Sequence, residues 1–137
     1  MADSARKVQY AHVMVPNRPG QGAKVLSELQ AAGVDLLAYS GFPGKRGAQI
    51  DLVTRDMSGL RRIARRNGWR LSKAKKAFLV QGTDRIGAVH RQLARLASRK
   101  VNVVAADAVA AGQGRFGMIL WVRPKDYARA ARALGAR

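Results

Sequence analysis

Asn17-Arg18-Pro19-Gly20 returns later in the chain as Asp84-Arg85-Ile86-Gly87, and the organisation of the sequence follows from this repetition. Each copy comes after a short apolar run and before apolar residues at helical spacing, which predicts a loop between a strand and a helix. The first backbone N–H groups of a helix lack partners within the helix, so they can hold a carboxylate or a phosphate. Both loops are therefore candidate anion-binding sites. For each of them a plain connection, with solvated Arg and Gly in a tight turn, stays open as the alternative.

The two loops belong to a longer internal repeat, in which residues 67 positions apart correspond, as Arg18 does to Arg85. The matches are apolar helix positions and turn glycines, which a repeated fold would keep. Matching pairs are Val13 and Val80, Gly20 and Gly87, Leu26 and Leu93, Leu29 and Leu96, Val34 and Val101, Gly47 and Gly114, and Gly68 and Gly135. The sequence therefore predicts two copies of one unit, over residues 1–75 and 76–137.

Hydrophobic periodicity and turn residues predict the elements of each copy. In the first copy we expect strands over 8–15, 36–41, 48–54 and 69–74, a helix over 21–32, and a second helix from the N-cap Ser58 to Asn67. In the second copy we expect strands over 77–81, 101–109 and 115–122, and helices over 88–99 and 124–134. The order βαββαβ predicts an α+β fold of two ferredoxin-like units, each an antiparallel sheet with helices on one face.

The second copy has no fourth strand of its own, because only Ala136 and Arg137 follow Gly135. This predicts an uncovered sheet edge, which a partner chain or the edge of the other unit could cover. We favour a homodimer.

Composition bounds the class of protein. With 137 residues, 47% of them apolar, the chain can build a core, which argues against a disordered protein. It has no cysteine, which excludes disulfides and thiol chemistry. Basic residues interrupt every apolar run, so we expect no membrane span, and the first residues lack the apolar core of a secretory signal. We expect a soluble, cytoplasmic protein.

The charge is strongly positive, with 26 Lys and Arg against 8 acidic residues and a net charge of +18. Both halves share the excess, and a denser basic run extends from Arg61 to Lys76 with no acid between Met57 and Thr83. Such a field attracts polyanions, although a solvated basic surface has the same composition. Few aromatic residues fall where they could stack on bases, so nucleic-acid binding rests on charge alone.

No group of residues predicts catalysis or metal binding. His12 and His90 have neither a second His nor a carboxylate at ligand spacing, and no Ser has a His-centred context. We therefore expect no enzyme, no metal and no cofactor.

The loops, the repeat and the element order resemble the ACT domain, a small regulatory βαββαβ unit that binds amino acids. Asn17-Arg18-Pro19-Gly20 is similar to the Asn/Asp-x-Pro-Gly loop of that family, and Gly33-Val34-Asp35-Leu36 is similar to its Gly-Val-Asn-Ile. The second copy carries Lys100-Val101-Asn102-Val103 at the corresponding place, with Ile86 instead of Pro in its loop. The resemblance covers nearly the whole chain, as two tandem copies.

The resemblance implies a ligand site between the loop after the first strand of one unit and the start of the second strand of another. By position, it implies that the ligand-binding residues are Asn17, Arg18, Pro19, Gly20, Gln21, Gly22 and Asp35 in the first copy, and Asp84, Arg85, Ile86, Gly87, Ala88 and Asn102 in the second. It further implies a standalone regulatory module that binds a small ligand, an amino acid, and acts on a protein partner in trans. The alternative is a basic interaction protein that has lost ligand binding and docks on nucleic acid or on an acidic protein.

Overall fold

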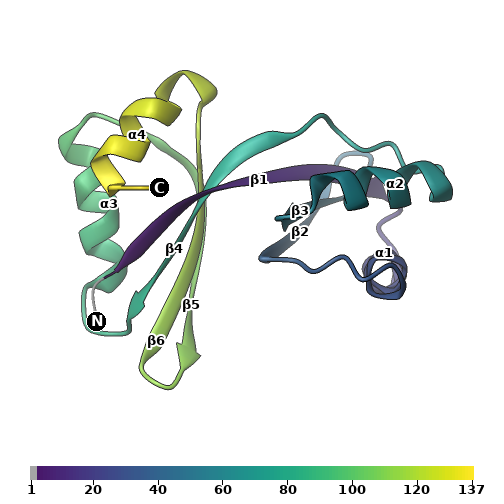
Figure 1. Ribbon diagram of the computed structural model, residues 1–137, viewed down its shortest axis with the longest axis horizontal. Helices are drawn as coiled ribbons and strands as arrows, with labels where there is room; N and C mark the ends of the chain where they lie inside the picture. Colours follow the sequence, from purple (N-terminus) through teal and green to yellow (C-terminus); the bar gives the residue numbers. More distant parts are fainter. Residues whose placement is uncertain (1–2) are drawn as a thin grey trace. The chain divides into compact units, whose positions relative to one another are not determined.

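A computed structural model describes residues 3–137, which form six strands and four α-helices (Figure 1). The strands are β1 (Ser4–Val15), β2 (Ala38–Gly44), β3 (Gly47–Thr54), β4 (Lys75–Thr83), β5 (Val103–Gly112) and β6 (Arg115–Val122). The helices are α1 (Gln21–Ala31), α2 (Met57–Asn67), α3 (Ala88–Ser98) and α4 (Tyr127–Leu134), with the short 3-10 helix η1 (Pro124–Asp126) before α4. The strands are hydrogen-bonded in the order β2-β3-β1-β4-β6-β5. The α+β class and the antiparallel sheet predicted from the sequence are confirmed.

The chain divides into two compact units, of which the first comprises Gln9–Lys75. In this unit β3 pairs with the C-terminal part of β1 on one side and with β2 on the other, both antiparallel. Alternate residues along β1 and β3 pack against α1 and α2, as the period of two in a strand requires. The core of this unit consists of Ala11, Val13, Val25, Leu29, Val34, Ile50, Leu52, Leu60 and Ile63.

The second unit joins the stretch up to Val8 to Lys76–Arg137. Here β6 pairs with β4 and with β5, again antiparallel, and α3 and α4 pack on one face (Figure 1). The core residues are Ala5, Phe78, Val80, Ala88, Leu96, Val101, Phe116, Met118, Leu120, Val122, Ala130, Ala131 and Leu134. None of the helices within residues 3–137 is long and apolar enough to cross a membrane.

The N-terminal part of β1 covers the edge of the second unit that the sequence left open. Strands β1 and β4 are hydrogen-bonded neighbours, and within this unit Arg6 donates to the side chain of Gln81 (3.4 Å). On its other side β1 exchanges backbone hydrogen bonds with the last residue, from Lys7 N–H to the carbonyl of Arg137 (2.9 Å) and from Arg137 N–H to the carbonyl of Ala5 (3.2 Å). The prediction that this edge of the second unit is uncovered was therefore wrong. The start of the same chain takes the place of the missing strand.

Two local predictions for the first unit were wrong. The strand expected over 69–74 is reduced to a bridge between Leu71 and Val13, with Ser72 N–H donating to the carbonyl of His12 (2.9 Å). The N-cap of α2 is Asp56 rather than Ser58, since the Asp56 carboxylate accepts hydrogen bonds from Gly59 N–H (2.8 Å) and from the Ser58 hydroxyl (3.1 Å). An aspartate at the N-cap satisfies a free N–H group and also places negative charge at the positive end of the helix dipole.

Candidate ligand site beside helix α3

The two repeated loops have the same backbone conformation at the start of their helices. Gly20 before α1 has φ +88° and Gly87 before α3 has φ +82°, both in the left-handed region that glycine tolerates best. Neither helix has a side-chain cap. The loops thus leave the N–H groups of each first helical turn without a capping side chain, as the repeated sequence predicted.

The hydrogen bonds that close the two loops also correspond. Gln21 N–H donates to the carbonyl of Arg18 (3.4 Å), and Ala88 N–H donates to that of Arg85 (3.0 Å). One turn on, Lys24 N–H donates to the carbonyl of Gly20 (3.0 Å) and Arg91 N–H to that of Gly87 (2.9 Å). The donor and the acceptor of each bond in the first loop lie 67 positions before the donor and the acceptor of the corresponding bond in the second loop, which is the offset of the sequence repeat.

A pocket of about 250 Å³ lies beside the second loop, within the second unit. Its walls are the loop and first turn of α3, the middle of β5, and one residue of β6. It is lined by Asp84, Arg85, Gly87, Ala88, Val89, His90, Ala108, Val109, Ala110 and Phe116. The pocket therefore combines a mostly apolar wall from the strands with charged and polar groups from the loop and the helix.

Four of the residues predicted for the second loop line this pocket: Asp84, Arg85, Gly87 and Ala88. Ile86 is fully exposed to solvent, and Asn102 is exposed and does not line the pocket. The structure thus brings only some of the residues predicted for the second copy together at one site. Ile86 extends into solvent, and Asn102 precedes β5.

Sequence reasoning missed the strand side of the pocket. Ala108 and Ala110 lie on alternate positions of β5, opposite Met118 and Phe116 of β6, whose side chains are in the core. These alanines therefore face the same side of the sheet as α3 and leave room beside it. The run of small residues Ala105–Ala111, so different from the large apolar residues of β6, was the signal for this space in the sequence.

The surroundings of the first loop differ, because the side chain of Tyr39 reaches the first turn of α1. Asn17, Arg18, Pro19 and Gly20 are exposed, and Gln21 and Gly22 are half-buried. The hydroxyl of Tyr39 is so close to Gly22 that a β-carbon at this position would lie 2.8 Å from the oxygen. Asp35 is exposed, and its carboxylate accepts a hydrogen bond from the N–H of Leu36 (3.0 Å).

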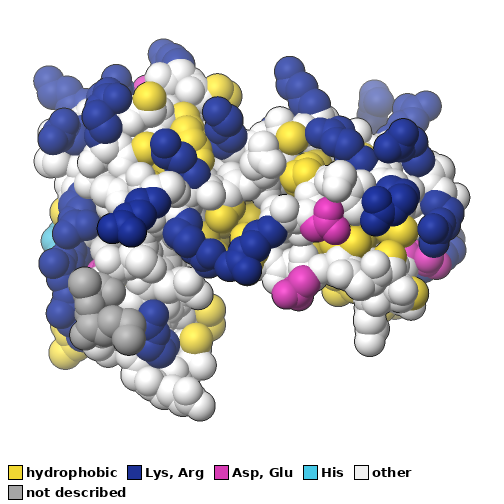
Figure 2. Space-filling model, viewed as in Figure 1, with side chains coloured by type: hydrophobic (Ala, Val, Ile, Leu, Met, Phe, Trp, Pro, Cys, Tyr) yellow, Lys and Arg dark blue, Asp and Glu magenta, His cyan; other side chains and the backbone are white. Residues whose placement is uncertain are grey.

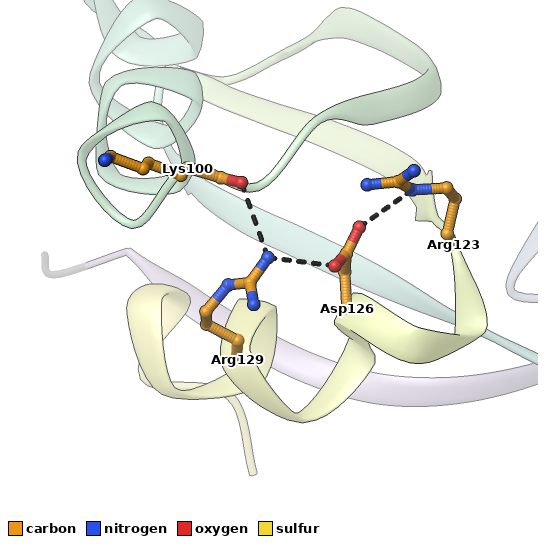
Figure 3. A network of polar contacts seen from close by, with 4 residues as sticks. All are labelled: Lys100, Arg123, Asp126 and Arg129. Carbon is orange, nitrogen blue, oxygen red and sulfur yellow. Dashed lines mark hydrogen bonds and ion pairs between the residues drawn. The ribbon is translucent and has the colours of Figure 1, made fainter.

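A buried carboxylate fixes the turn that leads into β5. Asp126 accepts hydrogen bonds from Arg123 Nε (3.0 Å) and from Arg129 Nη2 (2.9 Å), which also donates to the carbonyl of Lys100 (3.4 Å; Figure 3). Lys100 has φ +57°. Because Lys100 stands just before β5, this network ties the start of the strand that lines the pocket to the end of η1.

Residues 3–137 contain no group of three His, Asp or Glu side chains that could hold a metal ion. Of the two histidines, His12 has its pKa lowered by partial burial and by the charge of Lys75. His90 lines the pocket as an exposed residue of the first turn of α3.

The basic residues of α2 form a separate surface on the first unit. Arg61, Arg62, Arg65 and Arg66 are all exposed, and the helix contains no acidic residue. Figure 2 shows Lys and Arg side chains over α2 and, on the second unit, over α3 and α4. We call the four exposed arginines of α2 the arginine face.

No protein-family model and no curated protein matches the sequence. Solved structures do share its fold. A protein from Bacteroides thetaiotaomicron superimposes with a TM-score of 0.75 at 13% identity, over 97% of this chain and 88% of that chain. The ligand-free regulatory subunit of aspartate kinase from Thermus thermophilus superimposes with a TM-score of 0.64 at 17% identity, over 98% and 95% of the two chains. The corresponding regulatory subunit from Thermus flavus gives 0.58 at 20% identity, over 98% and 94%. The chain therefore shares its α+β fold with these regulatory subunits.

Proposed function

We propose that the chain is a tandem ACT-like regulatory protein that binds an amino acid in the pocket beside α3 and acts on a protein partner in trans. The observation that carries this proposal is the composition of the pocket. A first helical turn without a side-chain cap, the carboxylate of Asp84 and an apolar strand wall all border one space of about 250 Å³. The likeness in fold to regulatory subunits of aspartate kinase supports a regulatory rather than a catalytic role.

The chemistry of a free amino acid fits these three features. Its carboxylate would accept hydrogen bonds from N–H groups at the start of α3, where the helix dipole favours negative charge. Its ammonium group would lie beside Asp84, and its side chain would pack against Ala108, Ala110 and Phe116. Pockets that bind small molecules commonly have this combination of apolar walls and a few placed polar groups.

A thermal-shift experiment tests this function. The protein is unfolded and refolded to remove carried-over ligand, and its Tm is measured with each common amino acid at millimolar concentration. An amino acid at ~100 times its Kd should add ~2.7 kcal/mol of stability, a shift of several degrees. If no amino acid raises the Tm, the proposed amino-acid function is wrong.

A matched pair of variants connects any shift to the pocket. Ala108→Phe would fill the space, whereas Ala105→Phe places the same ring on the opposite face of β5, since successive residues of a strand alternate. We expect Ala108→Phe to abolish the ligand-induced shift and Ala105→Phe to retain it. Equal shifts in both variants would place the binding elsewhere.

We further propose that the protein acts as a homodimer joined through β5. This strand lies at one end of the strand order, and Val104 (59%) and Val109 (66%) are largely exposed. Residues 101–114 contain no Lys or Arg, in a chain with 26 of them. Two copies that each carry +18 repel one another least where positive charge is absent, and an unpaired apolar edge readily accepts another strand.

The arginine face supports a second candidate function, docking on a polyanion. Four guanidinium groups on one helix can each contact a phosphate, and binding would then fall steeply with salt. Retention on a nucleic-acid duplex at several salt concentrations tests this function. If the arginine face binds, replacing its four arginines with glutamine reduces the salt slope, whereas replacing Arg91 and Arg95 of α3 and Arg99 directly after it leaves the slope unchanged.

A further inference from the structure

The two copies of the repeat have different side chains at three corresponding positions around the first turn of the helix. The offset of the repeat relates Gly22 to Val89, Tyr39 to Ala106 and Gly41 to Ala108. The backbones of the two loops agree in their glycine conformations and in their hydrogen bonds. The two sites therefore differ in their side chains, and these three pairs are the ones that bear on the space beside each helix.

Tyr39 lies on the helix side of its sheet. It stands opposite Leu52 in the pairing of β2 with β3, and Leu52 is fully buried in the core beneath α1 and α2. From this position the ring of Tyr39 reaches the first turn of α1. Its hydroxyl oxygen would be 2.8 Å from a β-carbon on Gly22 and 3.3 Å from one on Gly41.

The two glycines make room for the ring. Real β-carbons essentially never approach another heavy atom as closely as 2.8 Å, so Val or Ala at position 22 would have to displace Tyr39. In the second unit the residues related to these glycines are Val89 and Ala108, and both line the open pocket. Ala106, which replaces the tyrosine there, has no ring to fill that space.

We propose that Tyr39 closes the first loop, so that each chain has a single open ligand site, in the pocket beside α3. This inference rests on the proposed function, since it concerns how many amino acids one chain binds. The phenol ring takes the place that the ligand's apolar side chain has in the second unit. Tyr39 therefore determines which of the two copies binds.

Stoichiometry tests this inference. Equilibrium dialysis of the refolded protein against each common amino acid, raised to saturation, should give one mole bound per mole of chain. Tyr39→Ala should raise the number to two, and the control Tyr39→Phe, which keeps the ring, should leave it at one. Tyr39→Ala combined with Ala108→Phe should return it to one, now bound at the first loop.

The possible failures are distinguishable. Two moles bound to the unmodified chain, or one mole bound to Tyr39→Ala, would overturn the role of Tyr39 and leave amino-acid binding intact. No binding to any variant would overturn the proposed function and this inference with it.

A thermal cycle checks the geometry without any ligand. Gly22→Ala should raise the Tm more in the Tyr39→Ala background than in the unmodified chain, because only the latter has a ring against position 22. Additive effects of the two substitutions would contradict the contact.

Discussion

The side-chain amide of Gln92 donates a hydrogen bond of 2.7 Å to the carboxylate of Asp3, which precedes it by 89 residues. Gln92 lies in the middle of α3 and is only 1% exposed. Asp3 stands directly before β1. This hydrogen bond therefore fastens the N-terminal end of the chain to a helix of the second unit.

Removing the Asp3 carboxylate, which accepts this hydrogen bond from Gln92, should destabilise the second unit. We expect Asp3→Ala to lower the free energy of unfolding by about 1–3 kcal/mol, since the buried amide of Gln92 would lose its partner. Asp3→Asn keeps an acceptor oxygen and should remain close to the unmodified protein. Urea unfolding followed by circular dichroism measures both, and an Asp3→Ala midpoint equal to that of Asp3→Asn would contradict the role of this hydrogen bond.

The N-cap residue of α2, Asp56, should make the stability of the protein depend on pH in the acidic range. Hydrogen bonds from Gly59 N–H and the Ser58 hydroxyl hold the pKa of Asp56 below its ordinary value. A carboxyl with a depressed pKa in the folded protein stabilises it above the unfolded pKa, near 4, and this contribution is lost as the pH falls through the folded pKa. Asp56→Asn keeps a capping oxygen but does not titrate. The difference in urea midpoint between Asp56→Asn and the unmodified chain should therefore change between neutral pH and pH ~3; a constant difference would exclude the effect.

Tyr127 should make the stability of the protein depend on pH in the alkaline range. Burial raises its pKa to about 12, and its hydroxyl donates a hydrogen bond to the carbonyl of Ala77 (2.9 Å) while its ring stacks on Phe78. A raised pKa favours the neutral form in the folded protein, so this stabilisation is complete below pH ~10 and is lost as the pH rises toward 12.

Ultraviolet titration should therefore show one tyrosine that ionises well above the others, absent from Tyr127→Phe. That variant should also lose less stability than the unmodified chain between pH ~10 and ~12. If the high-pH transition persists in Tyr127→Phe, it belongs to another tyrosine.

Charge placed on β5 should separate the proposed homodimer. Val104→Lys with Val109→Lys adds two positive charges to each copy of an edge that has none, and a charged edge strand resists pairing. We expect light scattering after gel filtration to show a dimer for the unmodified chain and a monomer for the variant. The control, Gln30→Lys with Ala31→Lys on the exposed side of α1, should remain dimeric. A monomeric unmodified chain would contradict the proposed dimer.

Much of the fold was predictable because it depends on residues close together in the chain. The glycines with positive φ at Gly20, Gly68, Gly87 and Gly135 each stand next to the end of a helix, and the helices follow their apolar spacing. The loop conformation at Gly87 and its repetition at Gly20 could likewise be read from the sequence. The loop residues Asp84, Arg85, Gly87 and Ala88, which line the pocket, were therefore among the residues that the sequence singled out.

Contacts between distant residues were decided only by the tertiary structure. The sequence repeat indicated that the second unit lacks a strand, but the pairing of β1 with β4 shows that the start of the chain takes its place. Strand pairing depends on which edges meet in space, and no local pattern encodes that choice. The register of the edge strands β2 and β5 likewise decides that Tyr39 and Ala106 face a helix, although the difference between these two side chains is present in the sequence.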